Sequence, residues 1–135
     1  MKSIKAFLIV LSLSIFSVSC EKEKDAHVPP NVSLKTGTGY TSADTEVAQA
    51  AQVTVGFVAD KTEDELKTFN VSYAFDNAAT TTTDTTITLT TAEEDHYEKD
   101  YTFTTRNQAG TEKWIFTITD RDGNIAQKQV VLTVK

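Results

Sequence analysis

The residues that could do acid–base or metal chemistry are few in this chain of 135 residues. It contains two histidines, His27 and His96, and a single cysteine, Cys20. Nucleophilic catalysis needs a serine, threonine or cysteine beside a base that activates it. His27 lies in a charged segment that nothing would hold in place, and no Cys or His spacing matches a zinc site. We therefore predict that the protein is not an enzyme. A small hydrolase that depends on His96 is the weaker alternative.

Acidic residues at two turns could bind a metal ion. Asp120, Asp122 and Asn124 look like the start of a calcium loop, but the EF-hand pattern needs glycine after the third ligand and a distant glutamate. Gly123 precedes the third residue and no glutamate follows, so turn chemistry explains them better. Residues 93–95 form a second acidic turn. We predict no cofactor or metal, and keep residues 120, 122 and 124 as weak candidates in a calcium-stabilised adhesin.

Two tyrosines and one threonine are candidates for ligand contact or modification. Tyr40 and Tyr97 are the aromatic residues of residues 31–135 that fall outside the alternating apolar pattern. Each could contact a ligand or pack under a loop. The segment Asp84-Thr85-Thr86 resembles the O-glycosylation acceptor of Bacteroidota-type proteins, which implies a glycan on Thr85; a plain strand start is the alternative.

The N-terminus carries a targeting pattern. Lys2 and Lys5 precede an uncharged, largely apolar run at residues 6–18, which is too short to span a bilayer and is typical of a secretory signal peptide. Residues 17–20 (Ser-Val-Ser-Cys) resemble the lipobox of bacterial lipoproteins, with serine where leucine is commonest. The resemblance implies that residues 1–19 are removed and that Cys20 is lipidated. An ordinary signal peptide with an unpaired cysteine is the alternative.

The charge balance restricts the partners. The chain has 13 basic and 19 acidic residues, and two of the basic ones precede Cys20. The mature chain therefore carries 11 minus 19, or −8, which argues against nucleic acid and against electrostatic adhesion to anionic lipid. Residues 20–30 read as a tether that ends in Pro-Pro. Its acidic start resembles a lipoprotein export signal. We expect an outer-membrane lipoprotein, either surface-exposed or facing the periplasm, whose lipid contacts the membrane.

The remaining residues, 31–135, alternate between apolar and polar in the period of two that is typical of β-strands. Residues 45–48 could add a brief edge piece, and residues 62–65 predict either one helical turn or a polar loop. Seven strands with frequent turns and no long helix predict an all-β domain, a seven-stranded immunoglobulin-like β-sandwich. The predicted strands are residues 31–36, 52–60, 67–76, 84–91, 97–106, 114–119 and 125–134.

The last two strands make a sharper prediction. Their apolar residues all have even numbers, from Trp114 to Ile118 and from Val130 to Val134. If both sets face one core, the loop between the strands must contain an odd number of residues. We predict a three-residue loop at residues 122–124, or a five-residue loop, with a positive-φ residue at its end. A bulge inside either strand is the alternative.

Three segments carry a family resemblance: residues 39–44 (GYTSAD), 66–69 (LKTF) and 110–124 (GTEKWIFTITDRDGN). They resemble single-domain, immunoglobulin-like lipoproteins of Bacteroidota, close to PKD-like repeats. The resemblance implies an immunoglobulin-like sandwich of unknown function. The chain departs from the antibody pattern, because Cys20 lies outside the domain and no disulfide can join the sheets, so we expect Trp114 to anchor the core through packing alone. We expect a cell-envelope module that acts in binding, adhesion or as a structural spacer, with a protein or glycan partner. A carbohydrate-binding accessory lipoprotein of a glycan-uptake system is the alternative.

Overall fold

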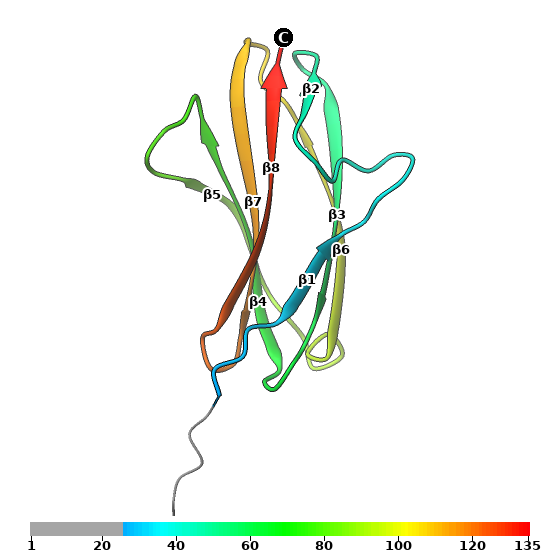
Figure 1. Ribbon diagram of the computed structural model, residues 1–135, viewed down its shortest axis with the longest axis vertical. Helices are drawn as coiled ribbons and strands as arrows, with labels where there is room; N and C mark the ends of the chain where they lie inside the picture. Colours follow the sequence, from blue (N-terminus) through cyan, green and yellow to red (C-terminus); the bar gives the residue numbers. More distant parts are fainter. Residues whose placement is uncertain (1–25) are drawn as a thin grey trace, which may run out of the picture.

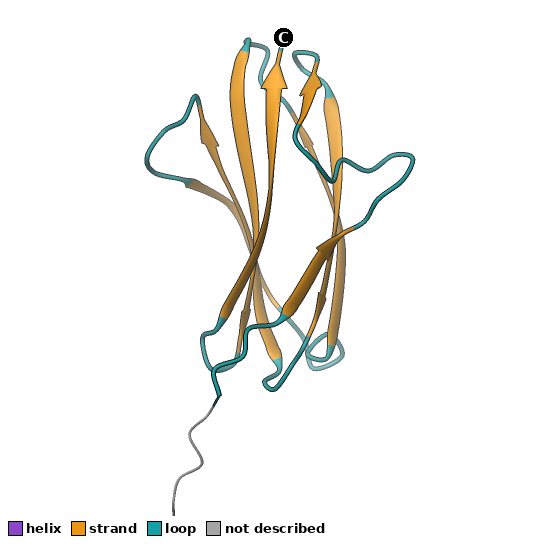
Figure 2. Cartoon of the chain, viewed as in Figure 1, coloured by secondary structure: helices purple, strands orange, loops and turns teal. Residues whose placement is uncertain are grey.

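The computed structural model describes residues 26–135, which form eight β-strands and no helix (Figures 1 and 2). No helix within these residues could therefore cross a membrane. The predictions for residues 1–19, Cys20 and the start of the tether lie outside the described residues. The strands are β1 (Asn31–Leu34), β2 (Thr45–Val47), β3 (Gln52–Asp60), β4 (Leu66–Phe75), β5 (Thr82–Thr88), β6 (His96–Thr104), β7 (Gly110–Asp120) and β8 (Ile125–Val134).

The predicted count of seven strands is wrong by one. The eighth is β2, the brief edge piece, which pairs in parallel with β8 from Thr45↔Leu132 to Val47↔Val134. The threonine-rich strand β5 also begins and ends earlier than predicted, although Leu89 just beyond it remains buried. Residues 62–65 form a loop with bends at residues 62–64, so the polar-loop alternative is confirmed and the helical turn is wrong.

The strands form two sheets. The three-stranded sheet has the order β1-β3-β6, and the five-stranded sheet has the order β2-β8-β7-β4-β5. The neighbours β1-β3-β6 and β8-β7-β4 correspond to strands A-B-E and G-F-C of immunoglobulin sandwiches. The strand order therefore supports an immunoglobulin-like sandwich, and β6 forms an open edge of the smaller sheet.

Aromatic side chains join the two sheets. The ring centroids of Phe57 on β3 and Phe69 on β4 lie 4.9 Å apart, and both side chains are fully buried. Phe103 on β6 stacks on Trp114 of β7 at 3.7 Å. Each such side chain contributes roughly 1.5–3 kcal/mol through burial, so these contacts hold the sheets face to face without a disulfide among the described residues.

The closing hairpin confirms the predicted register. Trp114 lies opposite Val130, every paired sum is even, and neither strand has a bulge. The Asp120 N–H donates to the Asn124 carbonyl at 3.1 Å, so three residues are enclosed, and Gly123 at their end has a φ of +89°. The loop is nevertheless residues 121–123 rather than 122–124. Asp120 accepts hydrogen bonds from the backbone and side-chain N–H groups of Asn124 and so extends the ladder by one pair.

Candidate functional site

A group of charged residues lies on the outer face of the three-stranded sheet. His96, Glu98 and Asp100 alternate along β6 with inward residues, so their side chains share the solvent side. Lys35, just after β1, reaches across β3 toward them: its Nζ lies 3.0 Å from both a Glu98 and an Asp100 carboxylate oxygen. We call Lys35, Tyr40, Asp60, His96, Glu98 and Asp100 the charge cluster.

Gly56 on β3 makes this arrangement possible. A Cβ at this position would lie 2.7 Å from carbon atoms of the Lys35 side chain, so the lysine stem can cross the strand only over glycine. The ammonium group then lowers the pKa values of Glu98 and Asp100, mainly through its hydrogen bonds to them. The same two hydrogen bonds raise the pKa of Lys35.

Tyr40, one of the two predicted ligand-contact residues, belongs to the charge cluster. Its hydroxyl donates to Asp100 at 2.9 Å, and this hydrogen bond raises the pKa of Tyr40. The Lys35 ammonium also lies 5.7 Å from the centre of the ring, within cation–π range. The ring is thus held in place by its neighbours, with part of its surface open to solvent.

Both ring nitrogens of His96 have partners. Nδ1 lies 2.7 Å from Asp60 and Nε2 lies 3.2 Å from Glu98. The hydrogen bond with Asp60, followed by that with Glu98, raises the pKa of His96 above its ordinary 6.5. Within residues 26–135 no group of three or more His, Cys, Asp or Glu side chains could hold a metal ion. His96 is therefore an ion-pair residue in this geometry.

This arrangement predicts a pH-dependent stability. Folding raises the pKa of His96, so protonated His96 stabilises the folded protein. This contribution to the free energy of unfolding is fully present below the pKa of the unfolded state and is lost as pH rises through the pKa of the folded state. We expect His96→Gln to lower the melting temperature more at about pH 5.5 than at about pH 8.5. An NMR titration should also show that Asp60→Asn moves the His96 pKa back toward 6.5. Equal losses at both pH values would contradict this role.

Tyr97, the other predicted ligand-contact residue, lies in the core. Its side chain is 4% exposed and its ring centroid lies 5.3 Å from that of Phe69. Tyr97 is opposite Ala59 on β3, facing the second sheet. Burial leaves no free ring face for a ligand, so the packing alternative describes this residue.

The weak calcium candidates form a turn. Asp120 is 1% exposed, and its two oxygens accept the backbone and side-chain N–H groups of Asn124 at 2.8 and 2.9 Å. An Asp122 oxygen lies 3.7 Å from Nε of Arg121. In the acidic turn at residues 93–95, Glu93 accepts hydrogen bonds from the backbone and hydroxyl of Thr90. These carboxylates stabilise their own turns, as turn chemistry predicts.

Thr85, the predicted glycosylation residue, lies on the edge strand β5. It is half-buried and pairs with Val71, so it points to the same side of the sheet as the core residues. The preceding Asp84 accepts a hydrogen bond from the Tyr101 hydroxyl of the other sheet. Glycosylation of Thr85 stays a prediction.

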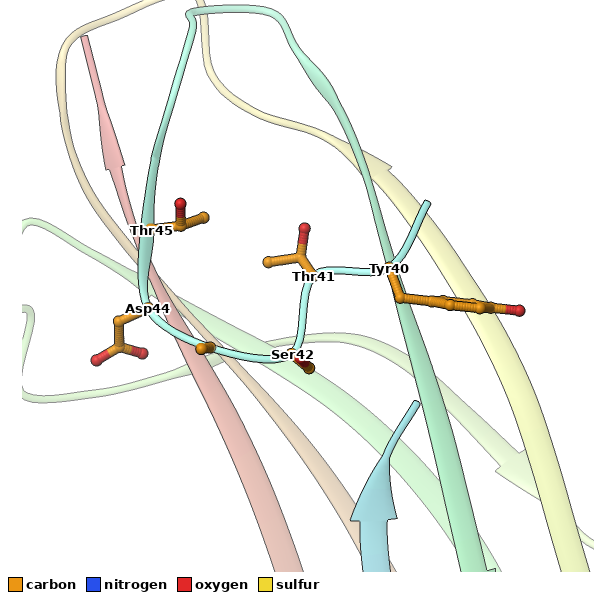
Figure 3. Close-up of a pocket in the computed structure, with 6 residues that line it drawn as sticks. Tyr40, Thr41, Ser42, Asp44 and Thr45 are labelled. Carbon is orange, nitrogen blue, oxygen red and sulfur yellow. The ribbon is translucent and has the colours of Figure 1, made fainter. Parts of the chain in front are cut away.

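A shallow hollow of about 280 Å³ lies along residues 40–45, where the chain crosses from one sheet to the other. Figure 3 shows that Tyr40 and Asp44 point away from each other on opposite sides of this loop. Asp44 accepts a hydrogen bond from the backbone N–H of Val131 on β8 at 2.8 Å. The two largest polar side chains of the loop are thus used to fasten it to the sheets.

The structure contains a buried ionic network that the sequence analysis does not predict. Glu112 is 0% exposed and accepts hydrogen bonds from the backbone N–H of Arg106 at 2.7 Å, from its Nε at 3.3 Å and from the Trp114 indole at 3.1 Å. Arg106 also binds Asp76 through two nitrogens and lies over the Phe75 ring. The expectation that Trp114 acts through packing alone is therefore wrong. The sequence does contain a signal for the buried position of Glu112. Its number is even, like those of the buried residues that follow it on β7, so alternation places it on the inward face.

No protein-family model matches the chain, and no curated protein matches it. Among solved structures, murine CRIg is similar, with 12% sequence identity and a TM-score of 0.42, over 78% of this chain and 98% of that one. This similarity is too distant to carry a conclusion about function, and the fold assignment above depends on the strand order of the chain itself.

Proposed function

We propose that the chain is a lipid-anchored, immunoglobulin-like module of the cell envelope that acts in binding, adhesion or as a structural spacer, without catalysis. The observation that carries the proposal is the Ser-Val-Ser-Cys segment at residues 17–20, directly after the apolar run of a signal peptide. The finer assignments, a PKD-like lipoprotein of Bacteroidota in the outer membrane, belong to the same proposal and depend on sequence resemblance.

The shape of the domain is compatible with an anchor at the N-terminus. Figure 1 shows the beginning of the described chain at one end of the long axis and the C-terminus at the other. A lipid on Cys20 would hold the first end near the membrane and direct the other end outward. A binding partner would then be a protein or a glycan that reaches the long faces or the distal end.

The charged and polar groups support a role without catalysis. The histidine, tyrosine and carboxylates of the charge cluster bind one another, and the buried carboxylate Glu112 is satisfied by Arg106 and Trp114. A general base must be within reach of a reacting proton, and both nitrogens of His96 are already engaged by carboxylates. This geometry favours a role for His96 in stabilising the fold over a role in proton transfer.

Labelling of the N-terminus tests the anchor. We expect metabolic labelling with radioactive palmitate to mark the wild-type chain, and mass spectrometry to find a mature chain that begins at acylated Cys20. Cys20→Ala should abolish both results, whereas Ser17→Leu, which restores the commonest lipobox residue, should keep them. A wild-type chain that begins elsewhere and carries no acyl group would refute the anchor.

A further inference from the structure

The outer face of the three central strands of the five-stranded sheet, β8, β7 and β4, contains almost no charge. At its border, Glu46 on β2 lies opposite Thr133 and forms an ion pair with Lys135. The residues of this face alternate with those that face the core: the even-numbered residues of 68–74 on β4, and the odd-numbered residues of 113–119 on β7 and of 125–133 on β8. Ser72 and Ala74 are buried, so the open part of this face lies mainly on β7 and β8. Lys113 is the one charged residue among these 13 positions, although residues 26–135 contain 9 basic and 16 acidic residues. We call these positions the charge-poor face.

Hydroxyl and amide groups dominate the charge-poor face. Asn70 donates to the Thr86 hydroxyl of β5 at 2.7 Å, and Gln127 donates to the Thr117 hydroxyl at 2.9 Å. Half-buried Ile115 and Val131 lie among them, and Ile125 is 56% exposed. Depletion of charge at the centre of a patch is a signal of protein–protein interfaces. The internal hydrogen bonds also order the side chains before a partner arrives, which lowers the entropic cost of binding.

The chemistry of this face is self-complementary. Hydroxyl and amide groups both donate and accept hydrogen bonds, so an array of them can pair with its own copy across a two-fold axis. The opposite face of the sandwich cannot, because it presents Asp60, Glu98 and Asp100 with Lys35 already bound between two of them. In a chain with an excess of carboxylates, the charge-poor face is where two copies approach with the least repulsion.

We propose that the charge-poor face is a homodimer interface, in which a second copy of the chain packs sheet against sheet. The strands of this sheet follow the long axis of the molecule (Figure 1). A two-fold axis parallel to them places both N-terminal ends at the same pole. Two copies anchored in one membrane could therefore pair side by side; this orientation rests on the proposed lipid anchor, whereas the contact between the faces does not.

A matched pair of variants tests the interface. Thr117 on β7 and Thr102 on β6 lie on opposite outer faces, and each hydroxyl has one hydrogen-bond partner, at 2.9 and 2.8 Å. Sedimentation velocity of the mature chain in detergent should show a dimer for the wild type and for Thr102→Glu. Thr117→Glu, which would oppose carboxylates across the axis, should weaken the dimer by at least about tenfold. A monomeric wild type, or equal weakening by both variants, would overturn the proposal.

Cross-linking in whole cells provides a second measurement that does not need Thr117→Glu to fold. A short bismaleimide should link Gln129→Cys chains into dimers, because Gln129 is exposed on the charge-poor face, and should leave Thr102→Cys chains as monomers. Linkage at neither position, or equally at both, argues against the interface. Linkage of the wild-type chain would show that Cys20 is a free thiol, which would count against the lipid anchor. The test of the dimer would then be whether the Gln129→Cys chain is linked more than the Thr102→Cys chain.

Discussion

Replacing Trp114 with alanine should lower the free energy of unfolding by about 3–5 kcal/mol. The indole is 5% exposed, stacks on Phe103 at 3.7 Å and lies 5.1 Å from the Tyr73 ring. Its removal leaves a cavity between the two sheets and deletes the hydrogen bond from Nε1 to Glu112. Both losses occur in the interior, where water cannot readily compensate for them.

Trp114→Phe separates the two losses. Phenylalanine keeps much of the ring stacking but lacks the N–H donor, so we expect a loss of about 1.5–3 kcal/mol, typical of a hydrogen bond to a charged group. Urea unfolding, followed by far-UV circular dichroism, measures the free energy of unfolding of the wild type, Trp114→Ala and Trp114→Phe. This signal does not depend on tryptophan fluorescence. A Trp114→Ala chain as stable as the wild type would show that the indole does not anchor the core.

Arg106→Ala should have a similarly large effect, about 3–5 kcal/mol, because it breaks an ion pair with a buried carboxylate. The Glu112 side chain is 0% exposed and Arg106 Nε lies 3.3 Å from it. The variant keeps the backbone N–H bond to Glu112 but removes the guanidinium, which also binds Asp76 and covers the Phe75 ring. Chemical unfolding again measures the loss.

Two controls identify the cause. Lys61→Ala removes an ion pair whose partner, Asp95, is 74% exposed, and should leave the unfolding midpoint nearly unchanged. Adding Glu112→Gln to Arg106→Ala removes the stranded charge, so the double variant should regain part of the lost stability. If Arg106→Ala behaves like Lys61→Ala, the buried carboxylate does not depend on the guanidinium.

Arg106 should also shape acid unfolding. Its hydrogen bonds, together with one from the backbone N–H of Thr111, lower the pKa of Asp76 from 3.8 to about 2. A carboxylate whose pKa is lowered by folding stabilises the folded protein at pH values above its pKa in the unfolded state. This stabilisation is lost as pH falls through its pKa in the folded state. The part of the difference in free energy of unfolding between wild type and Arg106→Ala that arises from Asp76 should therefore shrink as the pH falls from about 4 to about 2.

Some features of the candidate site could be predicted, and others could not. The alternation along residues 114–134 predicted the even register and the positive-φ residue of the closing turn, because side chains on a strand point to alternate faces. The same alternation included Glu112 at an inward position, but an acidic residue reads as solvent-exposed unless its partner is known. Arg106 and Trp114 supply the donors, and the pairing of Asp76 with Arg106, 30 residues apart, depends on how the strand ends meet.

Alternation and turn residues are local properties of the sequence. By themselves they determined that the described chain is built from strands, and where most of these strands begin and end. They also determined which side chains face inward. Tyr97 is among these, because it has the same odd parity on β6 as Tyr101 and Phe103, so alternation already places it on the core side. The tertiary structure alone decided that Tyr40 and Lys35 meet Asp100, and that the uncharged positions of β4, β7 and β8 form one face. Such contacts join residues tens of positions apart, so they exist only once the order of strands in each sheet is set. Hydrogen bonds and ion pairs act over a few ångströms, and the pattern along one strand does not specify which strand lies beside it.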